Sequence, residues 1–243
     1  SESPQLLNVF NKLNFGISKN IEGCSLAKYT IDKYMKTTKF STSELSNIIH
    51  PLYEKVTIDY LNSKGVRCAH EVFVRLPRKF KPDNMIERSD EFRNNIEQFQ
   101  NIISIPDSIK LISVDYTYTA DFDTLAEKFE KFYQSGDRML VIVLLGASNR
   151  KLKNFKEYLQ KATNEDKGSK HLEHVKILSL DEYREFLGFD GHYAKTFDLY
   201  QMMAFRTFSS KRFLYETALQ SNLVAKQLEA LNEDWINTYL RQR

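Results

Sequence analysis

The stretch MLVIVLL, from Met139 to Leu145, contains seven consecutive apolar residues and no polar interruption. A strand with one solvent-exposed face would alternate between apolar and polar residues. A continuous apolar run of this length is instead typical of a strand that is covered on both faces. Central strands of parallel sheets have this character. The run therefore predicts a buried strand at the centre of the fold.

The segments around this run alternate between strand and helix patterns. The segment at 109–118 is rich in β-branched and aromatic residues, as strands are. Apolar residues recur at helical spacing between this segment and the apolar run, and again after the run. Gly136 and Gly188 are suited to end helices. The order β-α-β-α-β predicts an α/β fold in which parallel strands are joined by right-handed crossovers. The predicted elements are a strand at 109–118, a helix at 123–136, the strand at 139–145, a helix through Leu152, Phe155 and Leu159, a strand at 175–180, and a short helix capped by Asp181 and ended by Gly188.

The regions on either side of this unit are predicted to be mainly helical. Ser41 and Glu44 form a capping-box pattern, Pro51 is expected to interrupt or restart the helix, and Gly65 supplies a left-handed stop. A strand is predicted at 66–76, and Ser89 is expected to cap a helix that reaches Ile103. We expect one compact unit with an N-terminal helical segment at 1–49, an α/β core at 50–188 and a C-terminal helical segment at 189–243.

Composition favours an intracellular protein. No stretch approaches the roughly eighteen apolar residues of a membrane helix, and the first twenty residues are polar, so we expect no membrane partner and a cytoplasmic location. Only two cysteines are present, Cys24 and Cys68. They fit a reducing compartment, although a disulfide between them stays open.

The formal net charge is only +3, so the overall charge does not indicate a nucleic-acid partner. Local clusters are more informative, because each contains several cations and no acid. They could contact phosphates or could be solvated surface. The first consists of Arg75, Arg78, Lys79 and Lys81, and the second of Arg150, Lys151, Lys153 and Lys156.

Several nucleotide and hydrolase motifs are missing from the chain. It contains no G-x-x-x-x-G-K-[ST], no G-x-G-x-x-G and no G-x-S-x-G. These absences argue against a P-loop, a dinucleotide site and a hydrolase nucleophile elbow.

The spacing of Leu61, Gly65 and Glu71–Val72, followed by the strand Ile112–Thr117 with Asp115, resembles the PD-(D/E)XK, or restriction-endonuclease-like, superfamily. The resemblance covers about 50–188. It implies a fold with a mixed sheet, in which a helix is followed by a three-strand meander, a second helix and a further strand. It also implies that Glu71 and Asp115 hold Mg²⁺ or Mn²⁺ in a catalytic site of a metal-dependent phosphodiesterase. Such an ion polarises the scissile phosphate and activates water.

The resemblance departs from the family pattern at the lysine. Its position matches Thr117, so activity requires a lysine from another element, with Lys110 and Lys128 nearest in sequence. Lys128 is the candidate that completes the catalytic set Glu71, Asp115 and Lys128. Pro106–Asp107 looks like the family's Pro-Asp pair, but it lies only eight residues before Asp115 and leaves little room for a separate strand.

Two other interpretations of these residues remain open. Residues 115–119, Asp-Tyr-Thr-Tyr-Thr, are similar to the D-x-D-x-T motif of haloacid-dehalogenase-like phosphatases, with Ser148 as the phosphate-binding hydroxyl, but Thr117 replaces the second aspartate. Asp115 could also simply end a strand and hydrogen-bond the start of the next helix, and Glu71 could pair with Arg75.

The function that we expect is nucleic-acid binding on a nuclease-like core, with the metal site degraded or rearranged. DNA or RNA phosphates would meet the basic residues Arg75, Arg78, Lys79 and Lys81 and the group Arg150, Lys151 and Lys153. The rival is a structural or interaction protein that forms a homo-oligomer or binds a partner through its C-terminal helices, between Phe197 and Leu240.

Overall fold

A computed structural model of the 243-residue chain describes most of the chain from residue 42 to residue 228. The described residues are 42–70, 74–75, 79–80, 82–117, 122–123, 125, 128, 137–145, 149–165, 173–207, 217–221, 223–225 and 227–228.

The described residues form an α/β fold around a five-stranded mixed sheet with the order β1-β4-β5-β6-β7. β1, β4 and β5 are antiparallel neighbours, whereas β5, β6 and β7 are parallel. The parallel unit predicted from sequence is therefore confirmed, including the pairing of the apolar run with the preceding strand. The strands are β1 (Cys68–His70), β4 (Asn84–Glu87), β5 (Leu111–Thr117), β6 (Arg138–Leu144) and β7 (Val175–Ser179).

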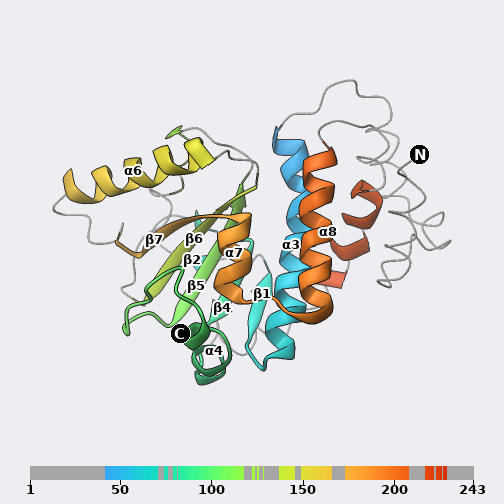
Figure 1. Ribbon diagram of the computed structural model, residues 1–243, viewed down its shortest axis with the longest axis horizontal. Coiled ribbons are helices and arrows are strands. Elements are labelled where there is room, and N and C mark those ends of the chain that lie inside the picture. The colour runs from blue at the N-terminus through green and yellow to red at the C-terminus, as the bar shows by residue number, and fades with distance from the viewer. Residues whose placement is uncertain are drawn as a thin grey trace.

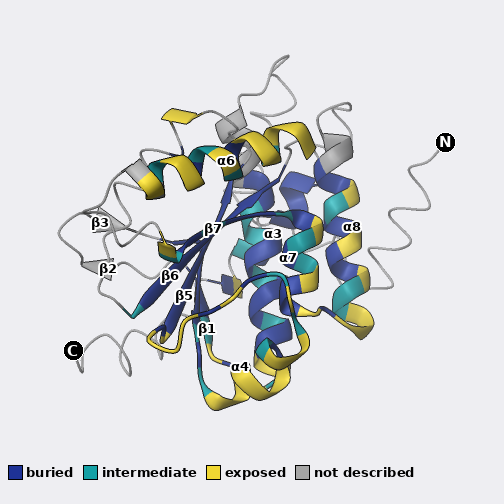
Figure 2. Cartoon of the chain, turned by 60° about the vertical axis from the view of Figure 1, so that its left-hand side comes forward, coloured by how far each residue is buried: buried dark blue, intermediate teal, exposed yellow. Residues whose placement is uncertain are grey.

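Helices cover both faces of the sheet (Figure 1). α3 (Thr42–Ser63), α7 (Leu180–Leu187) and α8 (Gly191–Thr207) pack on one face, and α6 (Asn149–Glu165) packs on the other. Successive residues of β6 alternate between these two cores, and every residue from Met139 to Leu145 is buried. Figure 2 shows the buried sheet between helices whose outer faces are exposed. This two-sided covering explains why β6 has no polar residue among its apolar ones.

Pro51 does not interrupt the first helix, contrary to the prediction. α3 continues through it to Ser63, and the neighbouring Ile49, Leu52 and Tyr53 are fully buried between the sheet and α8. Proline removes one helical hydrogen bond, but packing of a buried helix outweighs that local cost. Gly65 has φ 77° and ends the turn after the helix as predicted.

Two other helix boundaries differ from the prediction. Ser89 does cap a helix, but α4 (Asp90–Asn95) is short and is followed by a 3-10 turn, η2 (Glu97–Phe99), so that Ile103 lies beyond both. The break comes at Ile96, whose φ of −125° and ψ of −64° are not helical. The cap of α7 is Ser179 rather than Asp181, because Ser179 and Glu182 exchange side-chain to backbone hydrogen bonds. Gly188 ends α7 in the left-handed conformation as predicted.

The predicted strand at 66–76 is not one element among the described residues. β1 ends at His70, and β2 (Val74–Arg75) pairs with β3 (Lys79–Phe80) in a separate two-stranded ribbon. Sequence reasoning missed β4, which lies between β1 and β5 and completes the meander. Its four residues, Asn-Met-Ile-Glu, are too few for an alternation of apolar and polar residues to predict a strand.

The described C-terminal residues cover the chain's own core. Beyond α8, the described residues between 217 and 228 are helical, and Ala218, Val224 and Leu228 belong to the same buried cluster as α3 and α8. Trp235 and Leu240 lie outside the described residues. Cys68 is a free thiol. Over the part of the chain that is described, no helix has the length and apolarity needed to cross a membrane.

Candidate active site

Strand pairing brings two carboxylates together at one end of the sheet. Asn84 pairs with Val114 in the antiparallel register of β4 and β5, so the residue before Asn84 comes opposite the residue after Val114. These residues are Asp83 and Asp115, and both are buried. The backbone N–H of Tyr116 donates to Asp83 Oδ2 at 2.7 Å and orients that carboxylate. The two acids therefore meet where β5 ends and β4 begins.

A lysine ammonium contacts this pair from a helical segment. Lys128 Nζ donates to Asp115 Oδ2. The described residues of the 122–128 segment, which connects β5 with β6, are helical. Thr117 occupies the position two residues after Asp115 and is buried. The positive charge at Asp115 thus comes from Lys128, eleven residues beyond Thr117 in sequence.

Helix α3 adds an imidazole and a third carboxylate to this cluster. His50 and Glu54 are four residues apart and so share one face of the helix. His50 Nδ1 lies 3.6 Å from Asp83 Oδ1, and ligand atoms of His50, Glu54 and Asp83 all lie within 4.8 Å of one another. Glu54 also contacts His70 Nδ1 from β1. His50 Nε2 is buried and has no hydrogen-bond partner among the described residues, which leaves one imidazole nitrogen available to a cation.

The pKa values of these groups reflect competing burial and charge. Burial and the nearby charge of Asp83 raise the pKa of Asp115 to about 6, although Lys128 opposes the shift. Burial alone would raise the pKa of Asp83, but His50, the Tyr116 N–H and Lys128 together hold it below its usual value. Burial alone would lower the pKa of His50, but Asp83 raises it above the usual value. The cluster therefore concentrates negative charge that neighbouring cations must balance.

A buried hydroxyl network supports the cluster from behind. Tyr116 OH donates to Asn84 Oδ1 at 2.8 Å and lies within 3.0 Å of both Thr57 Oγ1 and Tyr183 OH. Asn84 Nδ2 in turn donates to the backbone carbonyl of Glu54 at 3.4 Å. These bonds connect α3, β4, β5 and α7, and they fix the helix that carries His50 and Glu54 relative to the strands that carry the aspartates.

The sequence-predicted site residues are only partly brought together. Asp115 and Lys128 are in contact, whereas Glu71 lies outside the described residues. Lys110 precedes β5, at the opposite end of the strand from Asp115. The exposed Asp107 is not the acid beside Asp115. That place is taken by Asp83, which follows Pro82.

The predicted phosphate-binding residues fall on two elements. Arg150, Lys151 and Lys153 are exposed at the start of α6. Arg75 and Lys79 belong to the β2–β3 ribbon, of which the structure describes only the backbone. Arg78 and Lys81 lie outside the described residues, as does Ser148, the hydroxyl expected by the phosphatase interpretation.

Sequence reasoning did not identify His50, Glu54 or Asp83 as site residues. The available signals were the Pro82–Asp83 dipeptide before a short apolar stretch and the spacing of His50 and Glu54 on a helix. Both are common in proteins without such a site, so neither decides the matter alone.

No family model, curated protein or solved structure matches this chain. The chemistry of the cluster itself therefore carries the functional conclusion.

Proposed function

We propose that the chain is a divalent-metal-dependent phosphodiesterase that cleaves nucleic acid on a restriction-endonuclease-like core. The observation that carries this proposal is the meeting of Asp83, Asp115 and the Lys128 ammonium at one end of the sheet. Two carboxylates and an ammonium are the groups that the superfamily uses to hold an ion and to orient the attacking water.

The order of the elements supports the same proposal. A helix, α3, precedes the antiparallel meander β1, β4 and β5, and the 122–128 helical segment leads to the parallel strand β6. Pro82–Asp83 stands directly before the second strand of the meander, and Asp115 lies in the third. Lys128 supplies the ammonium that Thr117 lacks. These features support the proposed superfamily pattern with a relocated lysine.

The residues present fit a divalent cation. The ligand atoms of His50, Glu54 and Asp83 lie within 4.8 Å of one another, and Asp115 lies beside Asp83 across the strand pair. Their carboxylate oxygens suit Mg²⁺, and the imidazole of His50 extends the donor set toward Mn²⁺. When bound, such an ion polarises the scissile phosphate and lowers the pKa of its water. Lys128 would then orient that water or stabilise charge on the phosphate. The exposed cations at the start of α6 would contact the phosphate backbone without reading sequence.

A cleavage assay with a matched control tests the proposal. Labelled single- and double-stranded DNA and RNA are incubated with Mg²⁺, Mn²⁺ or EDTA and the purified chain or a variant. Asp83→Asn, Asp115→Asn and Lys128→Met should each abolish metal-dependent cleavage. The control is Asp107→Asn, which removes the exposed carboxylate of the chain's other Pro-Asp pair and should cleave normally.

Metal binding is measured independently of cleavage. Mn²⁺ at about 100 times its dissociation constant should raise the free energy of unfolding of the native chain by about 2.7 kcal/mol. Asp83→Asn should lose most of that gain. Cleavage that survives Asp83→Asn, or a melting temperature that Mn²⁺ does not change in the native chain, would contradict the metal site. If the chain binds nucleic acid but does not cleave it, the protein is a nucleic-acid-binding protein rather than a nuclease.

A further inference from the structure

A surface hollow of about 540 Å³ lies beside the helical segment that supplies Lys128. One wall is Phe122, at the start of that segment, and the other is the outer side of α6. The Phe122 ring lies 4.8 Å from the ring of Tyr158 and 5.0 Å from that of Phe155, measured between centroids. Phe122 is nevertheless 45% exposed. The exposed Phe122 and the half-buried Tyr158 thus form an aromatic pair, and Phe122 also packs against the buried ring of Phe155.

The rest of the lining is polar and rich in amides. Asn154, Gln160 and Asn164 line the hollow together with Lys161 and Glu157. Side-chain amides both donate and accept hydrogen bonds, as the edges of nucleobases do. Ring faces, amides and an ammonium therefore surround a space that is open to solvent.

We propose that this hollow binds an unpaired nucleobase, so that the nucleic acid bound is single-stranded. This inference rests on the proposed function and names its substrate class. An unpaired base can stack on the Phe122–Tyr158 pair and bond to the amides, whereas a base inside a duplex is already stacked and paired. Stacking of this kind tolerates every base, because each has a π-face.

The charge of α6 favours a polyanion in this place. The described side chains of the helix include five cations and one carboxylate. Acidic neighbours offset part of this charge: Lys153 Nζ lies 3.8 Å from Glu157 Oε1, and Lys156 Nζ lies 2.6 Å from Glu182 Oε1. The helix still has a net positive charge, and its outer face is exposed (Figure 2). Both features suit a phosphate backbone that passes over this face.

The hollow is close enough to the carboxylates for one strand to occupy both. Phe122 packs against α6, and Lys128, which follows it by six residues in the sequence, contacts Asp115. α6 starts shortly after β6, whose last residue, Leu144, pairs with Thr117 at the end of β5. The first cations of α6 therefore lie at the same end of the sheet as Asp115. A base on Phe122 would place a neighbouring phosphate toward the metal cluster.

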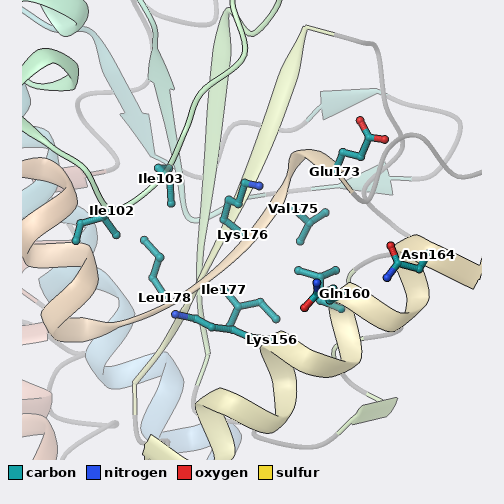
Figure 3. Close-up of a pocket in the computed structure, with 11 residues that line it drawn as sticks. Ile102, Ile103, Lys156, Gln160, Asn164, Glu173, Val175, Lys176, Ile177 and Leu178 are labelled. Carbon is teal, nitrogen blue, oxygen red and sulfur yellow. The ribbon is translucent and has the colours of Figure 1, made fainter.

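A second hollow, of about 320 Å³, differs from the aromatic hollow in its lining (Figure 3). It lies between α6 and β7, and Gln160 and Asn164 line it as well. Its floor is aliphatic, with Ile102, Ile103 and Ile177, and none of the described residues that line it is aromatic. It offers no surface on which a base can stack, so of these two hollows the aromatic one fits a nucleobase. A third hollow, of about 260 Å³, also contains rings and amides, including Phe99 and Asn95, but it lies beside α4, which follows the end of β4 opposite to Asp83.

The test measures binding to labelled oligo-dT and to a labelled blunt hairpin duplex by fluorescence anisotropy, in EDTA to prevent cleavage. Phe122→Ala should weaken oligo-dT binding about tenfold and leave duplex binding almost unchanged. Phe99→Ala is the matched control, because Phe99 is 77% exposed and lies on η2, outside the hollow. It should bind both ligands as the native chain does.

Two further variants separate stacking from folding. Phe122→Leu retains an apolar contact with Phe155 but has no ring, so it should show the same loss on oligo-dT with an unchanged melting temperature. Phe122→Trp should keep the affinity, and its indole fluorescence should be quenched by oligo-dT and not by the duplex.

Each outcome decides between the two proposals. If the native chain binds neither ligand, nucleic-acid binding and the base site are both overturned. If it binds oligo-dT and neither Phe122→Ala nor Phe122→Leu weakens that binding, or if Phe122→Ala weakens both ligands equally, the base site alone is overturned. Cleavage that depends on Asp83 would then still support the proposed function.

Discussion

Removing the hydroxyl of Tyr116 should destabilise the protein more than removing that of Tyr183, although both side chains are fully buried and touch each other. Tyr116 OH donates to Asn84 Oδ1 at 2.8 Å. The hydroxyls of Tyr116, Tyr183 and Thr57 form a triangle with sides of 2.9 to 3.1 Å. The two tyrosines thus share one network but hold different partners in it.

The difference in magnitude follows from which groups lose a partner. Tyr116→Phe leaves Asn84 Oδ1 buried without its donor, whereas Thr57 and Tyr183 can still bond to each other. A buried acceptor without a donor costs about 1–3 kcal/mol. Tyr183→Phe leaves Tyr116 bonded to both Asn84 and Thr57, so the expected loss is that of one ordinary hydrogen bond, about 0.5–1.5 kcal/mol.

Urea unfolding followed by far-ultraviolet circular dichroism measures both variants, and the dependence of the unfolding free energy on urea should not change. A double-mutant cycle with both tyrosines gives the coupling between their hydroxyls. Because Asn84 also bonds to the backbone of Glu54, Tyr116→Phe should weaken Mn²⁺ binding as well. A loss in Tyr183→Phe equal to or larger than that in Tyr116→Phe would refute this assignment of the hydrogen bonds.

Three further outcomes are expected. Folding raises the pKa of Asp115 to about 6, so the folded protein binds the proton of this carboxyl more tightly than the unfolded chain does. In the absence of metal, the protonated Asp115 therefore stabilises the protein fully below about pH 4, and this stabilisation is lost as the pH rises through 6. A carboxyl NMR titration should find a lower pKa for Asp115 in Asp83→Asn, and an unchanged value would mean that the two acids are not neighbours. Leu144→Ala should cost about 2–5 kcal/mol in chemical denaturation, because it empties a buried site in β6, and a loss below that range would mean that the site is not tightly packed. Ser179→Ala should cost about 1 kcal/mol through the lost cap of α7, whereas Asp181→Ala should cost less; the reverse order would assign the cap to Asp181.

Local patterns in the sequence determined much of the parallel half of the fold. The apolar run at 139–145 predicted β6, the helical spacing at 152–159 predicted α6, and Gly65 and Gly188 predicted where helical segments end. These signals are reliable because each depends on the residues of the element itself and on burial that its own periodicity reveals. Asp115 was identified differently, from the resemblance of the strand Ile112–Thr117 to the PD-(D/E)XK pattern.

The tertiary structure alone decided the antiparallel half and the membership of the site. β4 has four residues and becomes a strand because β1 and β5 pair with it on both sides, and α3 passes through Pro51 because its neighbours are buried. Glu54, Asp83 and Asp115 are about 30 residues apart in sequence, so no local pattern relates them. Strand register and helix packing bring them together, and those depend on the whole core rather than on any one segment.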